Sequence, residues 1–98
     1  MTQENKRELV VKLTNNLGVF RAKLGISQDI LAEKLGLTRQ TISAYENGQR
    51  EMTWSVFLAL IMFYFRNQST KRLLVALEVY TPELDDFLTI KKAGKQKF

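Results

Sequence analysis

The side chains that most often carry out chemistry in proteins are scarce in this sequence. Its 98 residues include no Cys and no His, which removes thiolates, disulfides, the commonest metal ligand and the commonest general base. Asp85 and Asp86 are adjacent carboxylates, but neighbouring residues point about 100° apart on a helix, so we interpret them as solvated surface acids. The sequence therefore predicts that the protein is not an enzyme and has no metal site and no cofactor.

Polar side chains suited to binding are concentrated between Thr38 and Asn47. Thr38 is a favourable N-cap for a short helix, in which Ile42 and Tyr45 share the face that would turn toward a core. Four further residues form the opposite, leading edge: Arg39, Gln40, Ser43 and Ala44. A polar edge with small residues can enter the major groove of DNA.

A second short helix precedes this one and must position it. Ser27 is its expected N-cap, Asp29 suits the positive end of the helix dipole, and Gly36 ends it after about two turns. Only Gly36, Leu37 and Thr38 separate the two helices, and such a short link with a glycine indicates a helix-turn-helix. Gly48 supplies the left-handed residue at which the chain leaves the second helix.

The N-terminal segment predicts one long helix. Asn5 and Glu8 have the spacing of a capping box, and apolar residues recur at helical intervals until Leu24, where Gly25 ends the helix. Gly18 weakens this helix without breaking it.

The remaining segments also predict helices, because strand-like alternation is not found. Thr53 starts a fourth helix, Ser69 or Thr70 caps a fifth, and Thr81 with Pro82 begins a sixth. We therefore expect an all-α bundle of five to six helices.

The charge and hydropathy of the chain narrow the classes of partner. A formal charge of +5 and a pI near 9.7 favour a polyanion such as nucleic acid. Residues 1–7 lack the apolar core of a signal peptide, which predicts a cytoplasmic protein. The longest apolar run, Val56–Phe65, is far shorter than the roughly 20 residues that span a bilayer.

Three stretches of the sequence resemble one known family. Arg21–Gln28, Leu31–Gly36 and Thr38–Gly48 closely resemble the phage-repressor-like (Cro/cI-like) helix-turn-helix family, and the resemblance extends over about 9–61. It implies a lambda-repressor-like helical bundle that binds duplex DNA sequence-selectively, usually as a symmetric dimer. We therefore expect a transcription regulator, most simply a repressor, with residues 38–47 as its recognition helix.

The resemblance also assigns roles to the leading edge of that helix. Arg39 and Gln40 correspond to the base-reading pair of the family; Arg can donate two hydrogen bonds to guanine, and Gln can pair with adenine. Thr41 and Ser43 would add a methyl contact or a phosphate hydrogen bond, and Ala44 offers a methyl group to thymine.

Other positions correspond to phosphate-binding and bracing residues of the family. Gln28 would bind a phosphate and also hold the recognition helix in place. Backbone amides and side chains of the following loop would hold flanking phosphates, and Glu51 interrupts that basic clamp. Arg21 and Glu46 correspond to a partly buried ion pair that orients the recognition helix. The predicted DNA-binding residues are Gln28, Thr38, Arg39, Gln40, Thr41, Ser43, Ala44, Asn47, Gln49 and Arg50.

The chain divides into three predicted parts: a helix-turn-helix core over 1–66, C-terminal helices over 67–90, and a basic, flexible tail over 91–98. The fourth helix has more large apolar residues than one face of a small bundle needs, including Trp54, Met62 and Phe65. Because the C-terminal helices would cover only part of this surface, we expect a homodimer.

Two alternative functions remain open from the sequence. The protein is either an antitoxin, whose C-terminal helices bind a toxin while the motif represses its own operon, or a protein-interaction module that has lost DNA binding.

Overall fold

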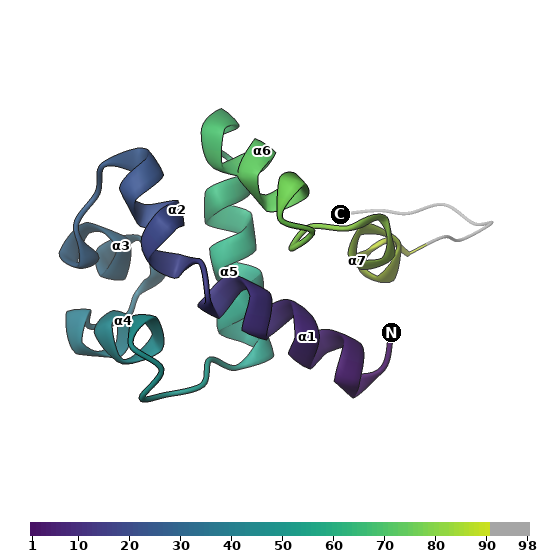
Figure 1. Cartoon of the computed structure of the whole chain (residues 1–98), viewed down its shortest axis with the longest axis horizontal. Coiled ribbons are helices and arrows are strands. Elements are labelled where there is room, and N and C mark those ends of the chain that lie inside the picture. Colours follow the sequence, from purple (N-terminus) through teal and green to yellow (C-terminus); the bar gives the residue numbers. More distant parts are fainter. Residues whose placement is uncertain (91–98) are drawn as a thin grey trace.

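The computed structural model describes residues 1–90, and all the regular elements in that range are α-helices. Its elements are α1 (Gln3–Thr14), α2 (Leu17–Leu24), α3 (Gln28–Leu35), α4 (Arg39–Glu46), α5 (Trp54–Phe65), α6 (Gln68–Ala76) and α7 (Pro82–Leu88), as Figure 1 shows. The all-α prediction is confirmed, although these residues form seven helices where the sequence indicated six. The predicted tail, 91–98, lies outside the described residues.

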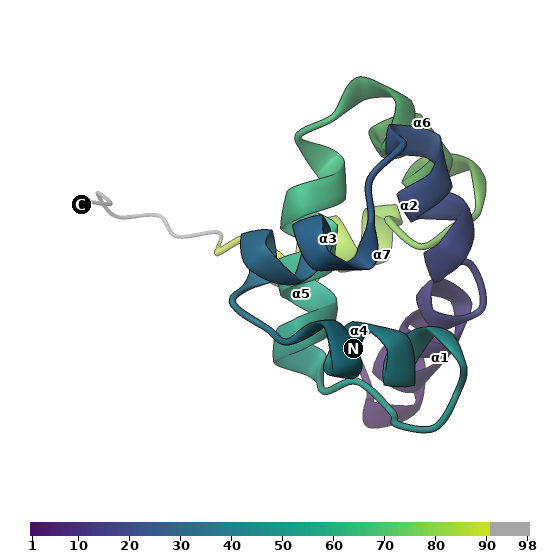
Figure 2. The same cartoon turned by 90° about the vertical axis from the view of Figure 1, so that its left-hand side faces the viewer.

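The bundle is built around α5, the most apolar helix (Figures 1 and 2). It packs against α1, α3 and α6, while α3 packs on α4 and α2 on α6. Phe20, Phe57 and Tyr64 are fully buried at the centre of this core. Burial of such large side chains contributes roughly 1.5–3 kcal/mol each to folding, so α5 fixes the place of the helix-turn-helix. None of the helices within residues 1–90 has the length and apolarity needed to cross a membrane.

The prediction of a single N-terminal helix is wrong, because the helix is interrupted between α1 and α2. Asn15 and Asn16 lie at the break, where the hydroxyl of Thr14 donates to the Val10 carbonyl at 2.7 Å and the amide of Asn16 to the Lys12 carbonyl at 2.8 Å. The Asn16 bond satisfies a carbonyl in the last turn of α1, where helical amide partners run out, while the Thr14 hydroxyl bonds back to its own helix. The apolar spacing continued across the break because both helices bury their apolar faces in the same core.

Two predicted caps are also wrong. The N-terminal capping box pairs Thr2 with Asn5, three residues upstream of the predicted pair Asn5 and Glu8. Asn67, and not Ser69 or Thr70, is the N-cap of α6, without a side-chain cap bond.

Thr70 is instead buried within α6. Its hydroxyl donates to the Tyr64 carbonyl at 2.6 Å and lies 3.2 Å from the Asn67 carbonyl. The Tyr64 carbonyl, near the C-terminus of α5 and held otherwise by a long 3.4 Å bond from the Asn67 amide, therefore receives a donor from the next helix.

The helix-turn-helix has the predicted limits. Ser27 and Thr38 cap α3 and α4 by accepting the amides of Ile30 and Thr41. Gly36 has φ = 69°, a left-handed conformation that glycine adopts without a steric penalty. The short turn that results holds α3 and α4 as one packed unit, which Figure 2 shows from its outer side.

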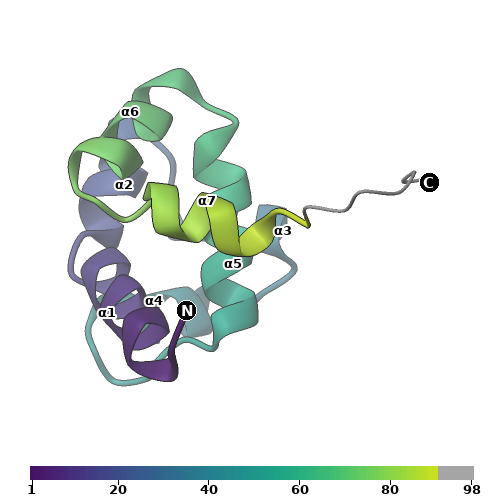
Figure 3. The ribbon, with the colours of Figure 1, turned by 90° about the vertical axis from the view of Figure 1, so that its right-hand side faces the viewer.

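The C-terminal helix lies across α5 on the side away from α3 and α4 (Figure 3). Thr81 caps α7 and Pro82 occupies its first turn, as the sequence predicts. Leu84 is fully buried, and Phe87 meets the Trp54 ring edge-on at 6.5 Å between centroids.

Candidate nucleic-acid interface

Helix α4, the predicted recognition helix, has one buried face and one open edge. Ile42 and Tyr45 are 2% and 3% exposed and attach α4 to the core. Arg39 and Gln40 are exposed in its first turn, and Ser43 and Ala44, one turn on, are half-buried. The structure thus brings the predicted leading edge together at the surface of a helix whose other side is fixed.

The hydroxyls at the start of α4 already bond to each other. The Thr38 hydroxyl oxygen accepts the Thr41 amide at 3.1 Å, and the two hydroxyl oxygens are 2.9 Å apart. Both side chains therefore serve first to begin the helix, and this arrangement fixes where Arg39 and Gln40 project.

A shallow concavity of about 250 Å³ interrupts the leading edge. It is lined by Arg39, Gln40, Ser43, Ala44 and Gln49. Ala44 has only a methyl side chain, so the surface is recessed between the longer side chains around it. Gln49, from the loop after α4, therefore joins the residues of the helix itself.

The far end of α4 is braced by a charged hydrogen-bond network. Arg21 Nε and Nη2 donate to the two carboxylate oxygens of Glu46 at 2.8 and 3.0 Å, and Nη1 donates to the Ile26 carbonyl at 3.1 Å. Gln28 Nε2 donates to Glu46 Oε1 at 3.0 Å. The expected ion pair is present, and Gln28 contacts the recognition helix with one amide N–H while its second N–H stays available.

The network also shifts the pKa of both charged partners. The hydrogen bond to Glu46 raises the pKa of Arg21, although burial opposes it. Burial acts to raise the pKa of Glu46, but hydrogen bonds from Arg21 and Gln28 and the guanidinium charge outweigh it, so that pKa is lowered. The pair is therefore ionised near neutral pH.

The backbone amides after α4 are used within the protein. The amides of Gln49 and Arg50 both donate to the Ala44 carbonyl, at 2.9 and 3.2 Å, and those of Asn47 and Gly48 donate to carbonyls within α4. The resemblance implied that amides of this loop hold phosphates. In this structure the amides of residues 47–50 cap the helix instead.

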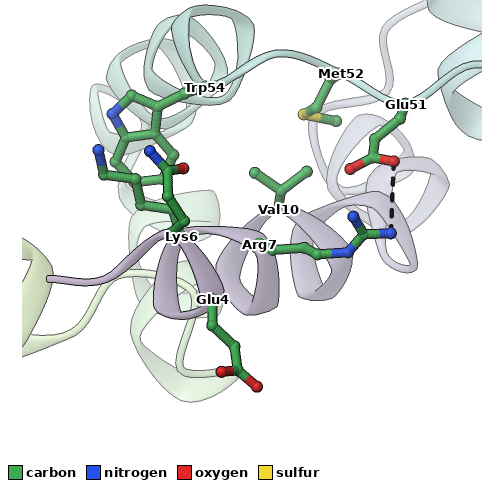
Figure 4. Close-up of a pocket in the computed structure, with 8 residues that line it drawn as sticks. Glu4, Lys6, Arg7, Val10, Glu51, Met52 and Trp54 are labelled. Atoms are coloured by element: carbon green, nitrogen blue, oxygen red, sulfur yellow. Dashed lines mark ion pairs between the residues drawn. The ribbon is translucent and has the colours of Figure 1, made fainter.

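Glu51, the acid in this loop, is compensated from α1. Its carboxylate lies 3.7 Å from an Nη atom of Arg7, and both side chains are exposed (Figure 4). The pair borders an open groove of about 380 Å³ between α1 and the loop, with Val10, Met52 and Trp54 among its lining residues. Arg50 is held differently, with its guanidinium 5.8 Å above the Tyr45 ring.

The distribution of charge limits what the bundle itself can contribute to binding a polyanion. Four of the 15 basic residues and none of the 10 acidic residues lie in 91–98, so residues 1–90 have nearly balanced charge. Within the candidate interface, the exposed basic side chains are those of Arg39 and Arg50. The candidate interface therefore offers directional hydrogen-bonding groups more than a broad basic surface.

Comparison with protein families matches residues 20–63 to a family model described as Helix-turn-helix. The matched segment, a little under half of the chain, begins within α2, ends within α5 and includes every predicted DNA-binding residue. Comparisons with curated proteins and with solved structures gave no match.

Proposed function

We propose that the chain is a sequence-specific repressor. The match of residues 20–63 to a helix-turn-helix family model supports a DNA-binding transcription regulator in general. In this proposal, α4 enters the major groove and two copies read half-sites about one helical turn apart. Occupation of a site that overlaps a promoter would exclude polymerase.

One observation supports the proposal above the others: Arg39 and Gln40 are exposed in the first turn of a rigidly held helix. The buried face of α4 and the bond from Arg21 to Glu46 fix both of its ends. A guanidinium can donate two bonds to guanine O6 and N7, and a carboxamide can pair with adenine N6 and N7. Each such pair contributes roughly 1–3 kcal/mol of discrimination.

Phosphate contacts would fix the register of α4 in the groove. Gln28 lies in the first turn of α3, where the helix dipole favours an anion, and one of its N–H groups is free of Glu46. Asn47 and Arg50 are exposed beside the C-terminus of α4. Their side chains would contact the phosphates of the DNA backbone and would not select a base sequence.

A second copy of the chain would cover an apolar groove, here named the α5–α7 face, whose lining also includes Arg66 and Tyr80. Its apolar lining residues are Leu58, Ile61, Met62, Phe65 and Leu88, of which Met62 and Leu88 are exposed. These residues line a groove of about 350 Å³, and Met62 is 73% exposed. A twofold-related copy can bury such a face against itself. It would also supply the second recognition helix that a palindromic site requires.

Selection of bound duplexes from a random pool tests sequence-specific binding. The wild-type chain is expected to recover a symmetric consensus. Arg39→Ala and Gln40→Ala should each relax one position of it, while Arg72→Ala, an exposed charge on α6, should leave it unchanged. A chain without any preferred sequence, or a biological activity untouched by both α4 substitutions, would instead support the interaction-module alternative.

Sedimentation tests the α5–α7 face. We expect a dimer for the wild-type chain and a monomer for Met62→Glu, because each copy would bury a carboxylate in the interface. Val75→Glu changes an exposed apolar residue of α6 and should leave the dimer intact. A wild-type monomer at high micromolar concentration, with and without DNA, would refute the homodimer.

A further inference from the structure

The concavity on α4 gives Gln49 a position that its place in the sequence does not suggest. Although Gln49 follows α4 in the loop, it lines the same recess as Arg39, Gln40 and the methyl group of Ala44. If the proposed function is correct, this recess faces the edges of the base pairs.

The backbone at Gln49 is fixed from two sides. Its amide N–H donates to the Ala44 carbonyl at 2.9 Å and lies 3.1 Å from the Asn47 side-chain oxygen. This amide already donates within the protein and is therefore not free to bind a phosphate. The same bonds hold the base of an exposed side chain against the leading edge, which leaves its carboxamide as the part that can contact DNA.

The chemistry of the recess matches one kind of base pair. Across the major-groove edge, an A·T pair presents adenine N7 and N6, then thymine O4, and then the thymine methyl group. A methyl floor at Ala44 suits the thymine methyl, and a carboxamide can accept from adenine N6 while donating to N7. From this match we infer that Gln49 is a base-reading residue, which recognises the adenine of an A·T pair whose thymine packs on Ala44.

A phosphate contact and a base contact have different signatures, which makes the inference testable. Loss of a phosphate contact weakens binding about equally for all sequences and lowers the salt slope by about one, whereas loss of a base contact relaxes one position. The experiment selects duplexes from a random pool with the wild-type full-length chain. It then measures affinity over a salt series for the consensus site and for sites substituted at each position.

With the wild-type chain, we expect one consensus position per half-site to require A·T, with about 5- to 150-fold weaker binding of other pairs. In Gln49→Ala this preference should be lost while the salt slope is unchanged. Arg50→Ala is the matched control, and it should weaken all sequences alike with a lower slope. Replacing the thymine at that position by uracil should weaken wild-type binding about fourfold, the effect of one buried methyl group.

The possible failures are distinguishable. A Gln49→Ala variant that behaves like Arg50→Ala, or that keeps every positional preference, overturns the base-reading assignment and leaves the proposed function intact. A consensus without such an A·T position, or an affinity insensitive to uracil there, also overturns it. A wild-type chain that selects no consensus overturns the proposed function itself.

Discussion

Removal of the Glu46 carboxylate should cost the protein both stability and DNA affinity. This carboxylate accepts two hydrogen bonds from Arg21 and one from Gln28, at 2.8–3.0 Å, and only 13% of its side chain is exposed. A hydrogen bond to a charged group contributes roughly 1.5–3 kcal/mol net. Because the Arg21 side chain is 25% exposed, water replaces part of what Glu46→Ala removes, and we expect a loss of about 2–3 kcal/mol.

Urea and thermal denaturation followed by circular dichroism measure this loss. For a domain of this size, 1 kcal/mol corresponds to roughly 4–8 °C in Tm, so Glu46→Ala should melt about 10–20 °C lower. A double-mutant cycle with Arg21→Ala isolates the pair, and we expect about 1–2 kcal/mol of coupling. Strict additivity of the two substitutions, or a loss below about 0.5 kcal/mol, would refute the bracing role.

The same carboxylate predicts how stability depends on pH. Its pKa in the folded protein lies below the ordinary value of 4.5, so the unfolded chain binds a proton first as the pH falls. The stabilisation is therefore fully present above about pH 4.5 and is lost progressively below it. Glu46→Gln should flatten the acid limb of a plot of unfolding free energy against pH, and an unchanged limb would contradict this assignment.

Three further substitutions test other features. Tyr64→Phe should stabilise the protein by about 1 kcal/mol in urea denaturation, because the buried hydroxyl has no hydrogen-bond partner among residues 1–90; a clear loss of stability would show that the hydroxyl is satisfied. Glu78→Gly should raise the free energy of unfolding by up to about 1 kcal/mol and Tm slightly, since Glu78 has φ = 58°. A lower Tm would argue against strain at this residue. Glu51→Gln should tighten DNA binding at low salt and Arg7→Ala should weaken it, because Arg7 offsets the charge of Glu51; equal affinities in a titration would refute this compensation.

Much of the fold could be predicted because local chemistry and tertiary structure agree there. Gly25, Gly36 and Gly48 end helices with positive φ, and Ser27, Thr38, Thr53 and Thr81 cap them as expected. The break after α1 was missed, because periodicity reports which face is buried and not whether the backbone is continuous. The pair Asn15 and Asn16, poor helix formers, was the available signal.

The sequence likewise predicts some features of the candidate site and not others. The orientation of α4 follows from Ile42 and Tyr45, and the structure agrees with it. The bond from Gln28 to Glu46 and the ion pair of Arg7 with Glu51 join residues 18 and 44 positions apart, so no local pattern could reveal them. The bonds from the amides of Gln49 and Arg50 to the Ala44 carbonyl could not be predicted either, because a sequence does not show which carbonyls need donors.

The position of α5 has a consequence for how such regulators diversify. One of its sides supports the helix-turn-helix and another carries the α5–α7 face. In the proposed function, target choice and partner choice would therefore reside in separate sets of side chains. Exchange of the residues around the recess on α4 would redirect the protein to a new operator without changing which chains pair. Conversely, substitution of Met62 and its neighbours would prevent two related chains from forming heterodimers, while each chain still bound its original DNA site.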